Sequence, residues 1–131
     1  MLTVAELDAI AQARLVDAEV LYKSGRHDGA VYLCGYAVEV ALKARICRTL
    51  DWPGFPSTGK EFQPYQSFRT HSLDTLLSLS GVERTIKSNH LADWSAVAIW
   101  DPEARYKPTG SATAQDAKLM IDSARVLLGA L

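Results

Sequence analysis

Residues 30–46 read AVYLCGYAVEVALKARI, and this stretch decides the fold of the 131-residue chain. Apolar or small side chains occupy nearly every position, so a helix formed here has no wide solvent-facing side and belongs in the middle of a bundle. Two charged residues, Glu39 and Lys43, nevertheless stand near its centre. Their i,i+4 spacing with the acid first favours an ion pair on the helix surface. Alternatively, Glu39 also reaches a cation of another helix inside a cleft, because a charge held away from water needs a partner.

Helical patterns extend to both sides of this stretch. The first helix is expected to begin at a capping box of Thr3 and Glu6 and to end at Gly25, and a short turn with Asp28 as the N-cap leads into the second. Two long helices joined by so short a turn are antiparallel neighbours. The sequence therefore predicts an all-α, up-and-down bundle of about five helices, without a strand. The expected helices cover residues 4–24, 28–50, 72–79, 83–100 and 113–128.

Residues 51–70, DWPGFPSTGKEFQPYQSFRT, are expected to form a loop. Three prolines and two glycines argue against regular structure. Five aromatic side chains are more than a flexible linker usually carries, and so long a loop in a compact domain has a task or a packing partner. This segment could cover the end of the bundle, line a cleft or meet a second subunit.

Composition predicts one soluble globular domain over residues 1–131. Hydrophobic residues make up 48% of the chain and charged residues 22%, which is ordinary for such a domain. The formal net charge of -1 gives no overall attraction to nucleic acid or to an anionic membrane, so any RNA contact requires a local patch. Neither a membrane-spanning run nor a signal peptide is visible, which predicts a cytoplasmic protein.

Cysteine and histidine are too few and too scattered to predict a metal site, and no cofactor motif is visible. Cys34 and Cys47 on one helix would lie about 20 Å apart, at a rise of about 1.5 Å per residue, which excludes a disulfide between them. Both thiols are expected to pack in the core. The histidines form no ligand pair on one helix face; they are His27, His71 and His90.

The hairpin carries a resemblance to a known family. A long helix, the turn of residues 25–28 and the run Ala-Val-Tyr-Leu-x-Gly-Tyr-Ala-Val-Glu-x-Ala-Leu-Lys-Ala resemble the first helical hairpin of HEPN domains, which are small all-α proteins of prokaryotes. The match covers roughly residues 14–46, with weaker continuations at 71–73 and 100–106. HEPN domains occur alone or beside a minimal nucleotidyltransferase. The resemblance therefore implies a homodimer, a nucleotidyltransferase partner of that kind, and a toxin–antitoxin or defence context.

Catalytic HEPN proteins are metal-independent ribonucleases, and their motif is an arginine followed four to six residues later by a histidine. Two subunits bring two such pairs into one cleft. An imidazole can take the proton of a ribose 2′-hydroxyl, and an arginine stabilises the charge on the phosphorane. Arg84 and His90 match this motif literally. However, six residues of helix turn through about 600°, so the two side chains point about 120° apart, and the motif should lie nearer Trp100.

The better positional match is the segment 101–106, which contains Arg105 and Tyr106. No histidine follows Arg105, so the general base of the family motif is missing. Arg105 is then expected either to bind phosphate or to form a structural bridge with Glu39. Tyr106 is expected to pack. His71 is expected to cap a helix end, or else to face the cleft near Glu39 or Arg105.

Three functions are compatible with these features. The first is a non-catalytic or regulatory HEPN module that binds a nucleotide, RNA or a nucleotidyltransferase, and near-neutral charge with the missing histidine favours it. The second is a metal-independent HEPN ribonuclease toxin, and the third is a structural adaptor that uses residues 51–70. The binding residues of the first would be Glu39, Lys43, Arg105 and Tyr106. The catalytic candidates of the second are Arg84, His90 and His71.

Overall fold

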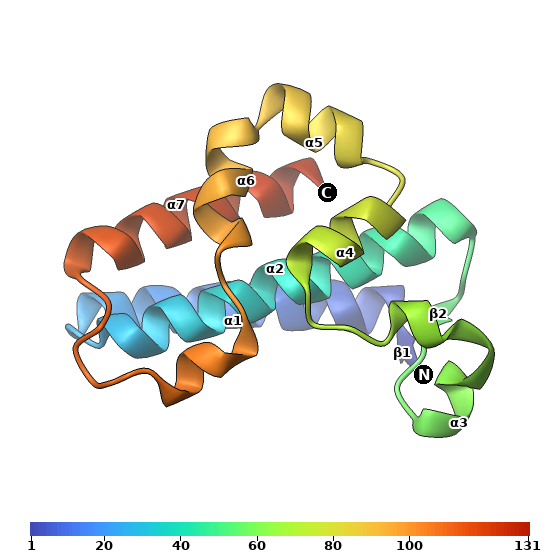
Figure 1. Cartoon of the computed structure of the whole chain (residues 1–131), viewed down its shortest axis with the longest axis horizontal. Coiled ribbons are helices and arrows are strands. Elements are labelled where there is room, and N and C mark those ends of the chain that lie inside the picture. The colour runs from blue at the N-terminus through green and yellow to red at the C-terminus, as the bar shows by residue number, and fades with distance from the viewer.

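Helices make up most of the protein in the computed structural model, which describes residues 1–131 (Figure 1). The all-α prediction is confirmed, but seven α-helices are present in place of the expected five, together with two 3-10 helices and one pair of two-residue strands. The elements in chain order are β1 (Leu2–Thr3), α1 (Val4–Lys23), α2 (His27–Leu50), β2 (Gly54–Phe55), α3 (Gly59–Phe62), η1 (Gln63–Phe68), α4 (Leu73–Leu79), α5 (Glu83–Asn89), α6 (Leu91–Ala98), η2 (Pro102–Tyr106) and α7 (Ala114–Ala130).

The predicted antiparallel hairpin is formed by α1 and α2, which lie side by side along the length of the molecule (Figure 1). Thr3 and Glu6 form the expected capping box. Gly25 carries the chain through the turn with a φ of 76°, in the left-handed region that glycine tolerates. The N-cap of α2 is Arg26, which makes no capping hydrogen bond through its side chain. The prediction of Asp28 as the cap is therefore wrong, because its carboxylate is bound to a distant loop.

The helix expected over residues 83–100 is in fact two helices. The chain breaks at His90, whose φ of -137° and ψ of 36° are not helical, and α5 and α6 lie on either side. The break allows Ile86 and Trp94 both to be buried, while the indole N–H of Trp94 donates to Asp74 on α4 at 3.1 Å. Tertiary packing thus overrides a helical pattern that is continuous in the sequence.

Residues 51–70 are more ordered than the expected loop. Strand β2 pairs antiparallel with β1, so the prediction without a strand is also wrong. Thr58 caps α3 by accepting a hydrogen bond from the backbone N–H of Glu61. The aromatic side chains pack on one another, with ring centroids 5.0 Å apart for Trp52 and Phe68. Phe55 is buried in the core, so this segment covers one end of α2.

The core forms around α2, which contacts α1, α4 and α7. The capping box of Thr113 and Asp116 starts α7, whose buried face packs on α2 and α6. Cys34 and Cys47 are free and buried, as predicted; burial raises the pKa of the Cys34 thiol to about 12, so it stays protonated. None of the helices combines the length and the apolar character needed to cross a membrane.

Candidate functional site

Four polar side chains of α2 share one helix face. Tyr32, Tyr36, Glu39 and Lys43 follow one another at spacings of four, three and four residues, which places them in a line along the helix. We call this line the α2 stripe. The residues on the opposite side of the helix, such as Cys34, Val38 and Leu42, are buried in the bundle.

Glu39 is the best-connected residue of the stripe. Only 3% of it is exposed, yet it holds two partners. Its Oε2 accepts from the ammonium of Lys43 at 3.1 Å, and its Oε1 lies 2.8 Å from Nδ1 of His71. The predicted i,i+4 pair is present, and the second cation-capable partner from another part of the chain is His71.

His71 is held by Glu39 with its ring facing solvent. A carboxylate can only accept, so Nδ1 donates in this contact, and Nε2 is left as an acceptor when the ring is neutral. The side chain of His71 is 61% exposed. The alternative that placed His71 near Glu39 is confirmed, whereas the expected helix cap is wrong because Ser72 caps α4 by accepting from the N–H of Thr75.

Tyr36 lies between Tyr32 and Glu39 on the stripe. Its ring meets those of Trp100, Tyr32 and His71, with centroids 4.9, 5.3 and 6.4 Å away. Burial, followed by the hydrogen bond with Tyr32, raises the pKa of Tyr36 to about 12. The negative charge of Glu39 acts in the same direction and the positive charge of Arg105 acts against it. Tyr36 is therefore a neutral phenol, and its pKa is influenced by both the Glu39 carboxylate and the Arg105 guanidinium.

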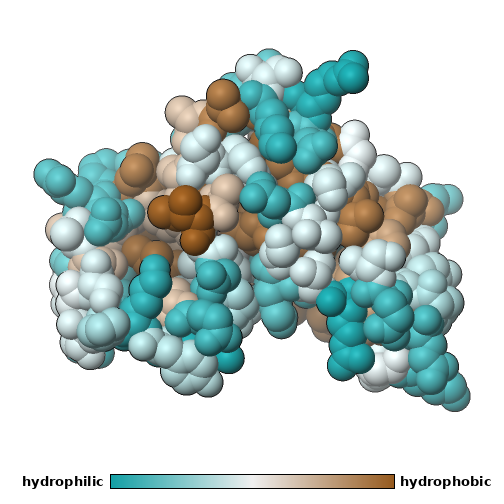
Figure 2. Space-filling model, in the orientation of Figure 1, coloured by the Kyte–Doolittle hydropathy of each residue, from teal (hydrophilic) through white to brown (hydrophobic).

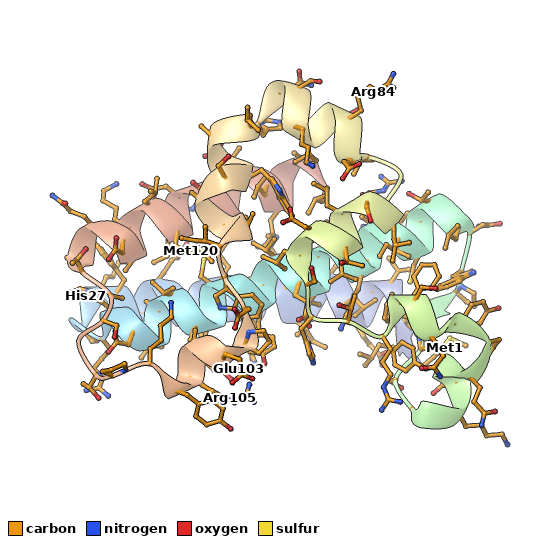
Figure 3. All side chains as sticks on the ribbon, viewed as in Figure 1. Met1, His27, Arg84, Glu103, Arg105 and Met120 are labelled. Carbon is orange, nitrogen blue, oxygen red and sulfur yellow. The ribbon has the colours of Figure 1, made fainter.

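Arg105 and Tyr106 lie on η2, at the lower edge of the molecule in Figure 3. The Arg105 guanidinium donates to the carbonyl of Pro102 at 3.0 Å, lies 3.7 Å from Glu103, and sits 4.6 Å from the centre of the Tyr106 ring. The expected bridge between Arg105 and Glu39 is therefore absent, because Glu39 is already occupied by His71 and Lys43. Tyr106 is 72% exposed, so the expectation that it packs is also wrong.

Arg84 and His90 do not belong to this site. Arg84 is exposed on α5, at the opposite edge of the molecule from Arg105 in Figure 3. His90 lies at the break between α5 and α6. No group of three or more histidine, cysteine, aspartate or glutamate side chains could hold a metal ion.

Asp28 links the loop beyond η2 to the start of α2 by two hydrogen bonds. Its two carboxylate oxygens accept from the backbone N–H groups of Gly110 at 2.7 Å and Ala112 at 2.8 Å. These hydrogen bonds lower the pKa of Asp28, because they favour the charged carboxylate. The contact therefore holds η2 beside the α2 stripe.

We expect the two hydrogen bonds that Asp28 accepts to depend on pH. Because the folded-state pKa of Asp28 is lowered, the contact is fully present above the ordinary aspartate range and is lost as the pH falls through the folded-state value. Amide hydrogen exchange of Gly110 and Ala112, measured by NMR, should be slow near neutral pH and faster in Asp28→Asn. The control Asp17→Asn removes a carboxylate that pairs only with Arg14 on the surface of α1. Equal exchange in both variants would contradict the account.

The sequence prediction named Glu39, Lys43 and Arg105, and gave a position of His71 near Glu39 as one of two alternatives. It did not name Tyr32 and Tyr36. A signal for Tyr32 and Tyr36 was present, since they continue the helical spacing of Glu39 and Lys43. Spacing could not decide between the two alternatives for His71, because 32 residues separate it from Glu39.

Comparison of the chain with models of known protein families, with curated proteins and with solved structures finds no significant match.

Proposed function

We propose that this protein is a non-catalytic or regulatory module of the HEPN type that binds RNA or a nucleotide along the α2 stripe. The observation that supports it most is the surface on which His71, Tyr36 and Tyr32 meet, with Arg105 acting on it from η2. Such a surface supplies aromatic faces for bases and donors for phosphate, which together make up single-strand recognition.

The positive charge that could attract RNA is confined to a small part of this surface. The chain as a whole carries a net charge of -1, so RNA would be attracted only where cations stand without strong partners. Arg105 meets its one acidic neighbour, Glu103, at 3.7 Å, a distance too long for a tight hydrogen bond. One guanidinium nitrogen also donates to the carbonyl of Pro102, so the remaining N–H groups of Arg105 are available to a phosphate.

The resemblance to HEPN domains extends this proposal to partners. We infer a homodimer, a minimal nucleotidyltransferase partner, and a role in a toxin–antitoxin or defence system. The exposed Tyr106 on η2 supports a partner surface near the site. The structural adaptor is not favoured, because Phe55 and Phe62 of residues 51–70 are buried in the core of this chain.

A metal-independent ribonuclease is the second candidate, and the contact between Glu39 and His71 favours it. A buried carboxylate that orients an imidazole leaves Nε2 able to act as a general base. That nitrogen would take the proton of a ribose 2′-hydroxyl, whose oxygen attacks the adjacent phosphorus. The 5′-oxygen of the next nucleotide leaves and takes up the proton that the imidazole has just accepted, and a 2′,3′-cyclic phosphate forms. Arg105 would stabilise the phosphorane.

One experiment tests both candidates. Binding of a fluorescently labelled single-stranded RNA, measured by anisotropy in the presence of a metal chelator, should be weakened about five- to tenfold by Arg105→Ala. Arg84→Ala removes the same charge from the opposite edge and should change the affinity by less than about twofold. Equal losses in the two variants, or no binding by the wild type, would contradict the binding proposal.

Analysis of the same RNA on a gel separates the candidates. Intact RNA at high protein concentration supports the binding module. Cleavage products ending in a 2′,3′-cyclic phosphate that disappear in His71→Ala would support the ribonuclease.

A further inference from the structure

A cavity of about 730 Å³ lies beside the α2 stripe. It is formed between the turn that joins α1 to α2, the end of α6, η2 and the first turns of α7, and Figure 3 shows His27 at this end of the molecule. Its size falls within the range of small-molecule sites, about 300–1,000 Å³. The residues that matter for its chemistry are Arg26, His27, Tyr32, Ile99, Arg105 and Lys107.

The cations of the cavity are available to a ligand. Arg26 and Lys107 make no ion pair within the protein, whereas Arg105 donates to the carbonyl of Pro102 and has Glu103 as an acidic neighbour at 3.7 Å. Three carboxylates also line the cavity, but each accepts hydrogen bonds from backbone N–H groups; they are Asp28, Asp101 and Asp116. Among the charged side chains of the lining, Arg26 and Lys107 are thus the two without a hydrogen-bond partner.

The start of α2 adds further donors. This 24-residue helix has no side-chain cap, so the N–H groups of its first turn lack a capping acceptor, and they lie in the wall of the cavity. Nδ1 of His27 and Nε1 of Trp100 lie behind the lining without a hydrogen-bond partner, and they are too deeply buried to contact a ligand directly.

Another part of the wall is apolar and open to solvent. Ile99 is 85% exposed and Leu119 58% exposed, although both line the cavity. Figure 2 shows hydrophobic atoms on this face beside α6 and α7. The ring of Tyr32 supplies an aromatic surface next to them. A ligand that suits both walls has a flat apolar body and an anionic end.

We propose that this cavity binds one nucleoside monophosphate. The phosphate would lie against Arg26, Lys107 and the first N–H groups of α2, and the base would cover Tyr32 and the exposed Ile99. The inference rests on the proposed function, because it specifies the nucleotide that the module takes. Arg26 and Lys107 belong to the cavity alone, whereas His71 and Lys43 belong to the stripe alone, so the two assignments can be tested apart.

Calorimetric titration with AMP and with adenosine tests the inference on the full chain. AMP should bind, and adenosine, which lacks the phosphate, should bind at least about tenfold more weakly. Arg26→Ala and Lys107→Ala should each weaken AMP binding about five- to tenfold. The matched control Lys60→Ala removes an exposed charge on α3 and should leave AMP binding unchanged.

The possible failures can be distinguished. No heat at millimolar AMP, or equal affinity for AMP in Lys107→Ala, Arg26→Ala and the wild type, would overturn the cavity assignment. RNA binding that remains sensitive to Arg105→Ala under those conditions would leave the stripe proposal standing. AMP binding that depends on Lys107 without any RNA binding would support the cavity and overturn the RNA-binding role of the stripe.

Discussion

Replacing Gly35 with alanine is expected to destabilise the folded protein by about 2–3 kcal/mol, the upper part of the range for overpacking a core. A Cβ atom at this position of α2 would lie 2.1 Å from two ring atoms of Trp100. The indole cannot move aside easily, because it is buried and packs against the ring of Tyr36 at 4.9 Å. The clash outweighs the gain in helix propensity, which is at most about 1 kcal/mol.

Urea denaturation measures this effect, and Gly129→Ala is its matched control. Gly129 is also helical, but nothing lies within 4 Å of a Cβ built there. That variant should be as stable as the wild type or slightly more stable. An unchanged midpoint for Gly35→Ala would mean that Trp100 does not lie against the α2 backbone.

The second large effect is expected at Glu39. Replacing it with alanine should lower the free energy of unfolding by about 1–3 kcal/mol, because the Lys43 ammonium, only 18% exposed, loses its acceptor. His71 loses the contact that orients its ring. RNA binding should fall as well, since His71 then no longer presents a fixed face.

A surface pair of the same spacing provides the comparison. Glu83 and Lys87 are also i,i+4, with side chains that are 43% and 47% exposed. Glu83→Ala should therefore cost no more than about 0.5 kcal/mol. If Glu39→Ala and Glu83→Ala destabilise the protein equally in urea, then Glu39 is not the buried centre of the stripe.

The parts of the fold that could be predicted from the sequence are those that follow from the local spacing of apolar, capping and turn residues. The α1–α2 hairpin follows from apolar spacing, a capping box and Gly25. The break at His90 could not be found in this way, because it depends on how α5 and α6 pack on other elements. Within residues 51–70, the spacing of Thr58 and Glu61 was a visible sign of α3, but the pairing of β1 with β2 joins segments more than 50 residues apart.

Some residues of the candidate site could likewise be predicted from the sequence, and others could not. Glu39 and Lys43 stood out because charges are rare in a helix so apolar. From the sequence alone, either Arg105 or His71 could be the partner of Glu39. The structure selects His71, because the chain between η1 and α4 brings that residue to α2. Tyr106 illustrates the converse case, since an aromatic residue that sequence alone assigns to packing is in fact exposed.

The α2 stripe as an RNA-binding surface is tested most directly by NMR titration of the isotopically labelled protein with a short single-stranded RNA. We predict that the amide and side-chain signals of Tyr32, Tyr36, His71 and Arg105 shift together and saturate with one affinity. Signals of α5 around Arg84 should stay in place. Shifts spread over α5, or none on α2, would contradict the account.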